Sequence, residues 1–207
     1  MNKGDLFRWY DCLDGDVFVK DTDIKDRGKS IFMRLINDLT TFIQNIQRKR
    51  KGLPPIKGRD HTELFLWSDS VLETHSSQSG KGARTQNMLH WLVQEDYPKG
   101  ILLRRHKRIT PEEKVAMQSM IAKDRGLPYA TRDGILDGLK LDYNNIKPYA
   151  VPEDELIHRG IYCSESTLKW SLFQKWAGLW PDPLVLFLLN NGYYIAFEGD
   201  TSTWIDN

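Results

Sequence analysis

The stretch that decides the fold reads IYCSESTLKWSLFQKW over residues 161–176. From Ser164 to about Trp176 its apolar residues recur at helical spacing, which predicts a helix. Cys163 stands at the start of that helix, where the helix dipole and the first backbone N–H groups favour a thiolate. The pattern therefore indicates a candidate nucleophile, and an inert buried cysteine is the alternative.

A candidate base lies far upstream, at the head of a predicted β-hairpin. His61 opens an alternating apolar run over residues 61–67, and a second strand pattern covers residues 71–75. Glu73 lies an even number of residues after His61, so a turn of odd length would place both on one face, where the carboxylate can orient the imidazole. A two-residue turn would break this parity, which leaves the register open. His75, two positions further on and on the same face as Glu73, is the rival orienting residue.

The remaining patterns predict a mixture of helices and strands around this pair. We expect strands at 17–19, 101–103, 184–187 and 193–197, helices at 30–50, 87–94 and 110–123, and a Ser/Gly-rich loop at 76–85. The fold class is α+β, with residues 1–207 forming a single domain that carries a helical insertion at about 30–58.

Composition narrows the function classes. The 29 Lys and Arg residues against 28 Asp and Glu leave a net charge of +1, which gives no overall attraction to nucleic acid. Two cysteines cannot form a zinc ribbon, and a zinc site of His61, His75 and Cys163 lacks any short ligand pair, so we predict no metal and no cofactor. The first residues carry no apolar signal segment and no apolar run is long enough to span a bilayer, so we expect a cytoplasmic protein without stable membrane insertion.

Several short motifs in this order resemble the permuted papain-like cysteine hydrolases, the YiiX-like branch of the NlpC superfamily, in which the histidine precedes the cysteine. The motifs are residues 15–18, 61–66, 71–73, 126–129 and 161–165. The resemblance implies a small antiparallel sheet or barrel packed on the helix that carries the cysteine. It also implies Cys163 as nucleophile, His61 as base and Glu73 as third member of the triad.

Members of that family cleave amide bonds in cell-wall peptides, and relatives act on lipid acyl groups and thioesters. The resemblance therefore implies a cysteine amidase acting on peptide or muropeptide substrates. Without a signal peptide, such an enzyme would recycle wall fragments inside the cell or enter a competitor's periplasm as an antibacterial effector with an immunity protein. An acyl hydrolase or transferase, and a binding module without catalysis, are the alternatives.

Overall fold

The computed structural model describes residues 7–21, 31–50, 52, 59–131 and 148–205. The strands are β1 (Val17–Asp21), β2 (Arg59–Ser68), β3 (Val71–Gln78), β4 (Gly82–Asn87), β5 (Lys99–Arg105) and β6 (Tyr193–Asp200). The helices are α1 (Ile31–Arg50), α2 (Met88–Gln94), α3 (Pro111–Asp124), α5 (Glu153–Arg159), α6 (Cys163–Trp170) and α7 (Pro181–Asn190), with short 3-10 helices at Trp9–Asp11 and Thr201–Trp204.

The strands form one open antiparallel sheet in the order β4-β3-β2-β1-β5-β6. In the central strand, Val17 lies between Leu64 of β2 and Leu103 of β5. Because side chains alternate along a strand, Val17 and Val19 share one face, while Phe18 lies on the other. The α+β class with an antiparallel sheet is therefore confirmed.

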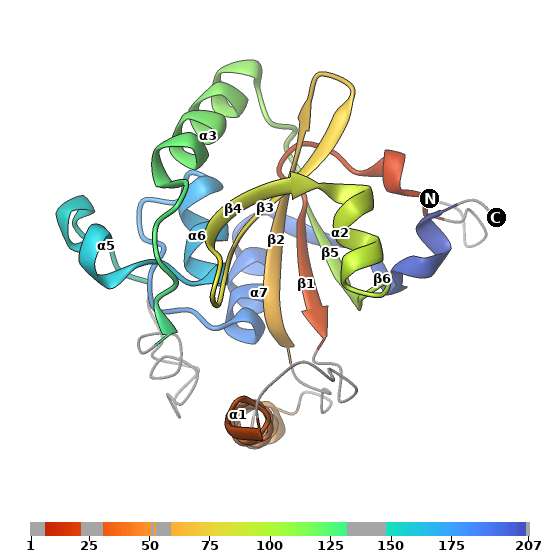
Figure 1. Cartoon of the computed structure of the whole chain (residues 1–207). Helices are drawn as coiled ribbons and strands as arrows, with labels where there is room; N and C mark the ends of the chain where they lie inside the picture. Colours follow the sequence, from red (N-terminus) through yellow and green to blue (C-terminus); the bar gives the residue numbers. More distant parts are fainter. Residues whose placement is uncertain (1–6, 22–30, 51, 53–58, 132–147, 206–207) are drawn as a thin grey trace.

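Both faces of the sheet are covered. In Figure 1, α6 and α7 lie behind the sheet, α3 lies to one side of them, and α2 lies in front. Val17, Val19 and Leu64 pack with apolar residues of α3, α6 and α7. On the other face, Phe18 and Phe65 pack edge-on against Trp91 of α2, with ring centroids 5.5 and 5.9 Å away. Burial on both sides fixes the strand register and hence the position of each site residue.

The predicted loop at residues 76–85 is wrong, because this segment forms most of a second hairpin made by β3 and β4. Its two buried serines are hydrogen-bonded inside the fold: Ser76 donates to the Thr62 carbonyl and Ser77 donates to the Ile161 carbonyl, each at 2.6 Å. Gly82 has φ +68°, and a Cβ there would collide with the Leu127 carbonyl oxygen. Specific hydrogen bonds, which a composition argument does not see, hold this hairpin in place.

Two expectations near the C-terminus also need correction. Residues 184–187, expected as a strand, belong to α7, because a short apolar run fits a buried helix as well as a strand. The helix expected from Ser164 to about Trp176 ends at Trp170. There Leu172 adopts φ +66° and the Phe173 N–H donates to the Leu168 carbonyl, which closes the helix in a Schellman arrangement without a glycine.

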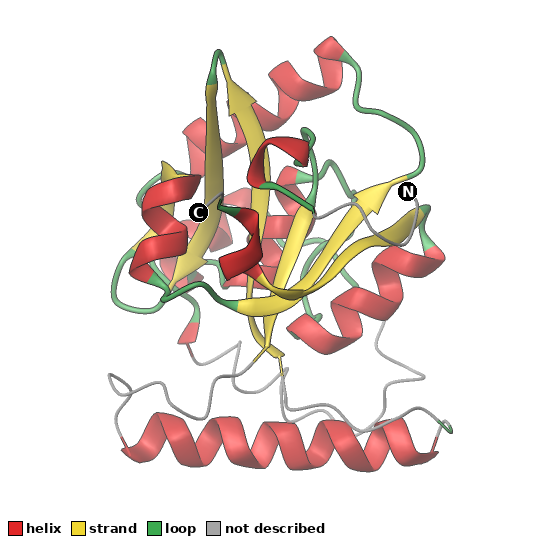
Figure 2. Cartoon of the chain, turned by 90° about the vertical axis from the view of Figure 1, so that its right-hand side faces the viewer, coloured by secondary structure: helices red, strands yellow, loops and turns green. Residues whose placement is uncertain are grey.

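The helix expected in the insertion is present as α1, and residues 30, 51 and 53–58 of that insertion lie outside the described residues. In Figures 1 and 2, α1 lies beyond the end of the sheet at which β1 ends and β2 begins. The Arg48 guanidinium joins it to the body by contacting the Asp182 carboxylate at the start of α7, with 3.2 Å between Nη1 and Oδ1. None of the described helices combines the length and apolar character that a bilayer-spanning helix needs.

Candidate active site

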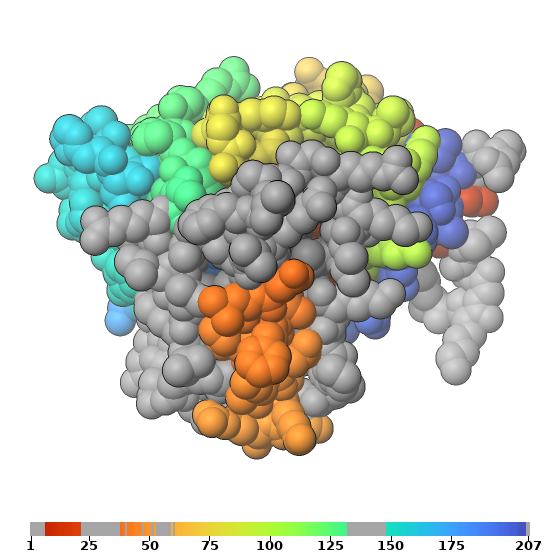
Figure 3. Space-filling model, turned by 60° about the horizontal axis from the view of Figure 1, so that its bottom comes forward, coloured from red at the N-terminus to blue at the C-terminus, as the bar shows by residue number. Residues whose placement is uncertain are grey.

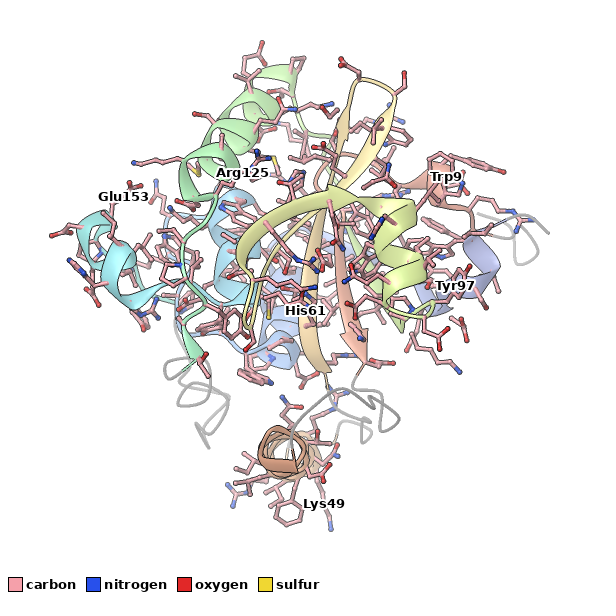
Figure 4. The ribbon with its side chains drawn as sticks, in the orientation of Figure 1. Trp9, Lys49, His61, Tyr97, Arg125 and Glu153 are labelled. Carbon is pink, nitrogen blue, oxygen red and sulfur yellow. The ribbon has the colours of Figure 1, made fainter. Side chains whose placement is uncertain are left out.

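His61 lies near the start of β2, opposite Lys20 of β1, and is labelled in Figure 4. Residues two apart on a strand project from the same face, so His61 and Glu63 are neighbours. Their contact is direct, with 2.9 Å between His61 Nε2 and Glu63 Oε1. A carboxylate only accepts hydrogen bonds, so this contact places a proton on Nε2.

Ser76 of β3 supports the same protonation of the ring. Its hydroxyl donates to the Thr62 carbonyl at 2.6 Å, and its oxygen lies 3.1 Å from His61 Nε2. Since the hydroxyl proton is already used, the serine oxygen accepts from Nε2. Glu63 and Ser76 thus hold one ring nitrogen as a donor and leave Nδ1 to serve as the base.

Cys163 is the first residue of α6. The residue before it, Tyr162, caps the helix without a side-chain hydrogen bond to the first turn. Helix starts normally use Ser, Thr, Asn or Asp there to satisfy the first N–H groups. With Tyr162 at this position, the positive end of the helix dipole lies beside Cys163, where it favours a thiolate.

Hydrogen bonds from the sheet set the position of α6. All eight of its residues are buried. Thr62 Oγ1 of β2 lies 2.8 Å from Thr167 Oγ1 of the helix, and Ser77 of β3 holds the Ile161 carbonyl just before it. The strand that carries His61 is therefore also hydrogen-bonded to the helix that carries the thiol.

A buried ion pair holds the first turn of α6 from the opposite side. Glu165 is fully buried, and Arg159 donates to its two carboxylate oxygens at 2.6 and 3.0 Å. The Gly178 N–H also donates to the same carboxylate. Glu165 is thus paired within the fold and anchors the helix start.

His61 and Cys163 come together. Burial by itself would lower the pKa of His61, but hydrogen bonds with the Cys163 and Glu63 side chains, together with their charges, raise it to about 10. The imidazole is therefore protonated at neutral pH when the sulfur beside it is a thiolate. Because Nε2 is held by Glu63 and Ser76, the sulfur is the partner of Nδ1.

Glu73 does not lie beside His61. The turn between β2 and β3 has two residues, Asp69 and Ser70, so Glu73 is opposite Leu66. Its carboxylate lies 3.7 Å from His75 Nε2, which exceeds hydrogen-bond length. The structure thus places Glu63, rather than Glu73, at the base, and sequence reasoning missed both Glu63 and Ser76. The signal for Glu63 was its spacing of two residues from His61 on one strand.

His75 is also separate from the pair. Its Nδ1 lies 2.9 Å from Thr85 Oγ1, and burial, with the Arg125 charge, lowers its pKa to about 4. It is therefore a neutral, buried side chain at physiological pH. Among the residues that the structure describes, no three His, Cys, Asp or Glu side chains are grouped as metal ligands.

Comparison with known proteins gives limited similarity. No protein-family model matches the sequence, and no curated protein matches it. Among solved structures, the chain is similar to the crystal structure of the metalloprotein YiiX (DUF1105) from Escherichia coli O157:H7. The TM-score is 0.45 and the sequence identity 14%, over 91% of this chain and 87% of that chain.

Proposed function

We propose that this protein is a cysteine hydrolase that cleaves amide bonds, with Cys163 as nucleophile, His61 as base and acid, and Glu63 as the orienting carboxylate. The proposal is carried by one observation: the thiol at the start of α6 is the hydrogen-bond partner of an imidazole whose other nitrogen is bound by a buried carboxylate. This nucleophile–base–orienter arrangement is the geometry of covalent acyl transfer. The relation to permuted papain-like hydrolases is part of the same proposal.

The reaction follows from the placement of the protons. The Cys163 thiolate attacks the amide carbon, and the developing oxyanion is stabilised by the positive end of the α6 dipole. His61 gives its Nδ1 proton to the leaving nitrogen, so the amine departs and a thioester remains on Cys163. His61 then takes a proton from water, hydroxide attacks the thioester, and the acid product leaves with the thiolate restored. Throughout, Glu63 keeps the Nε2 proton in place.

Cell-wall peptides are the substrate class that we propose, acted on as recycled fragments or in a competitor's periplasm. Hydrolysis is measured by mass spectrometry on purified muropeptides, with an acyl ester and an acyl thioester of similar size in parallel. Cleavage of the muropeptide amide supports the proposed substrate. Cleavage of the ester or thioester alone would replace it by lipid or thioester hydrolysis with the same catalytic residues.

Chemistry at Cys163 is tested by comparing the two thiols of the chain. Cys12 is buried, and burial together with the nearby Asp16 charge raises its pKa well above the usual value. We therefore expect iodoacetamide at pH 6 to alkylate Cys163 at least about tenfold faster than Cys12. Cys163→Ala is expected to abolish turnover in a chain that still folds, whereas Cys12→Ala keeps turnover. Equal slow labelling of both thiols, or turnover by Cys163→Ala, would refute the proposal.

A further inference from the structure

Helix α1 presents an apolar stripe to solvent. Leu39, Phe42 and Ile46 are 49%, 62% and 36% exposed, and their spacing of three and four residues places them on one face. The opposite face is turned to the body of the protein and is polar, with Gln44 and Arg48 buried. A surface helix of a globular protein normally has the reverse arrangement. The exposed stripe thus contributes nothing to the core and needs another explanation.

Positive charge adjoins this stripe. At 100° per residue, Lys49 and Arg50 project on either side of the direction of Ile46, and both are exposed. The helix ends in three consecutive basic residues and contains Asp38 as its acidic residue, whereas the chain as a whole carries only +1. A strongly amphipathic helix with an apolar stripe and adjoining cations fits an anionic bilayer surface.

The size of the stripe disfavours a second copy of the chain as its partner. Three side chains with these exposures offer roughly 300 Å² of surface, so a pair of copies would bury about 600 Å², less than the roughly 1,000 Å² of a specific interface. A bilayer needs no complementary protein surface, and insertion of three apolar side chains into the headgroup region suffices for reversible binding.

The position of α1 leaves this face accessible. Figures 1 and 2 show α1 at the periphery, beyond the end of the sheet, and Figure 3 shows it in front when that end is turned forward. The labelled Lys49 lies on the side of α1 away from the sheet in Figure 4. Helix α1 is held to the body through the contact of Arg48 with Asp182. Asp182 also binds Arg59 Nη1 at 2.6 Å, and Arg59 lies two residues before His61 in β2. The stripe therefore lies at the same end of the molecule as the start of the strand that carries His61.

We propose that α1 seats the protein on anionic lipid bilayers, with Leu39, Phe42 and Ile46 in the headgroup–acyl boundary and Lys49 and Arg50 against lipid phosphates. Binding by α1 requires no chemistry at Cys163, so it stands apart from the proposed hydrolase activity. Phosphatidylglycerol supplies the anionic headgroup for the test. Free phosphate should not substitute for this lipid as a ligand, because it offers no acyl chains to the apolar stripe.

The test is flotation of the full chain with vesicles of pure phosphatidylcholine or of phosphatidylcholine containing about a third phosphatidylglycerol. We expect binding to the anionic vesicles at least about tenfold stronger than to the neutral ones. Phe42→Ser/Ile46→Ser should lower the partition coefficient about tenfold or more, and the control Ile157→Ser, equally exposed on α5, should not.

Charge is tested with a second matched pair. Lys49→Gln/Arg50→Gln should lose at least about tenfold in binding to anionic vesicles, because each cation near the surface contributes about fivefold and two together contribute about 25-fold. Lys107 and Arg108 are consecutive exposed cations outside α1, and the control variant Lys107→Gln/Arg108→Gln should bind like the original chain. Cys163→Ala should also bind unchanged, whatever the outcome of the hydrolysis assays.

Three results would overturn the proposal. The first is that the chain floats no more with anionic vesicles than it does in vesicle-free samples or in samples with 1 mM free phosphate alone. The second is equal binding by Phe42→Ser/Ile46→Ser and the unaltered chain. The third is a dimer in light scattering that Phe42→Ser/Ile46→Ser converts to a monomer, because the stripe would then belong to a second copy.

Discussion

Glu63 is the residue whose replacement separates orientation of the base from the overall fold. Glu63→Gln keeps the shape and a carbonyl acceptor for His61 Nε2 but removes the charge that helps to raise the pKa of His61. The imidazolium then loses its proton at lower pH. We expect kcat/KM to fall by about 10²-fold or more and the basic limb of its pH profile to move to lower pH.

Glu73→Gln is the matched control, since Glu73 is a partly exposed carboxylate of the neighbouring strand that approaches His75 instead. Its pH profile should overlay that of the unaltered chain. The assignment of Glu63 is wrong if Glu73→Gln shifts the basic limb and Glu63→Gln leaves it in place.

At the candidate site, the sequence pointed to Cys163 and His61 but not to the residues that hold them in place. The start of a helix and the head of an alternating run were visible around Cys163 and His61, and the structure brings these residues together. Whether Glu73 could face His61 depended on the length of the turn between β2 and β3, and a difference of one residue reverses the answer. Sequence patterns leave that length undecided. Ser76 had no signal, because its role arises from pairing between β2 and β3.

A double-mutant cycle can measure the hydrogen bond between Thr62 of β2 and Thr167 of α6. Thr167→Val leaves the buried hydroxyl of Thr62 without its partner at 2.8 Å, and we expect a loss of about 1–3 kcal/mol in the free energy of unfolding. Thr62→Val/Thr167→Val removes both polar groups and should recover part of that loss. Urea denaturation of the single and double variants gives the values, and a fully additive double variant would contradict a direct hydrogen bond.

Elements with local signals were predicted well. Helix α3 begins with the capping box of Thr110 and Glu113, which the sequence shows directly. In contrast, α6 ends through a leucine in the left-handed region, where a glycine is expected. Leu172 packs against the core, so contacts from distant residues offset a cost of about 1–2 kcal/mol that local preference would forbid.

The stability of the whole molecule should depend on pH through His75. Burial, with a smaller contribution from Arg125, lowers its pKa from 6.5 to about 4, so the folded chain binds fewer protons than the unfolded chain between these values. The free energy of unfolding is therefore unaffected by His75 above about pH 6.5. It decreases as the pH falls toward 4, by about 3 kcal/mol in total.

Denaturant unfolding between pH 4 and 7.5 checks this dependence. His75→Asn should flatten the slope by about one proton, whereas His90→Gln, a change at an exposed histidine, should leave it unaltered. An equal slope for His75→Asn and the unaltered chain would show that other groups cause the acid destabilisation.

The contact between Cys163 and His61 is tested most directly by an NMR titration of the His61 ring in the intact chain and in Cys163→Ala. We expect a pKa of about 10 in the intact chain, because the sulfur and Glu63 outweigh burial, and a clearly lower pKa once the sulfur is removed. Titration near the ordinary value of about 6.5 in both proteins would contradict the thiolate–imidazolium pair and the hydrolase proposal that depends on it.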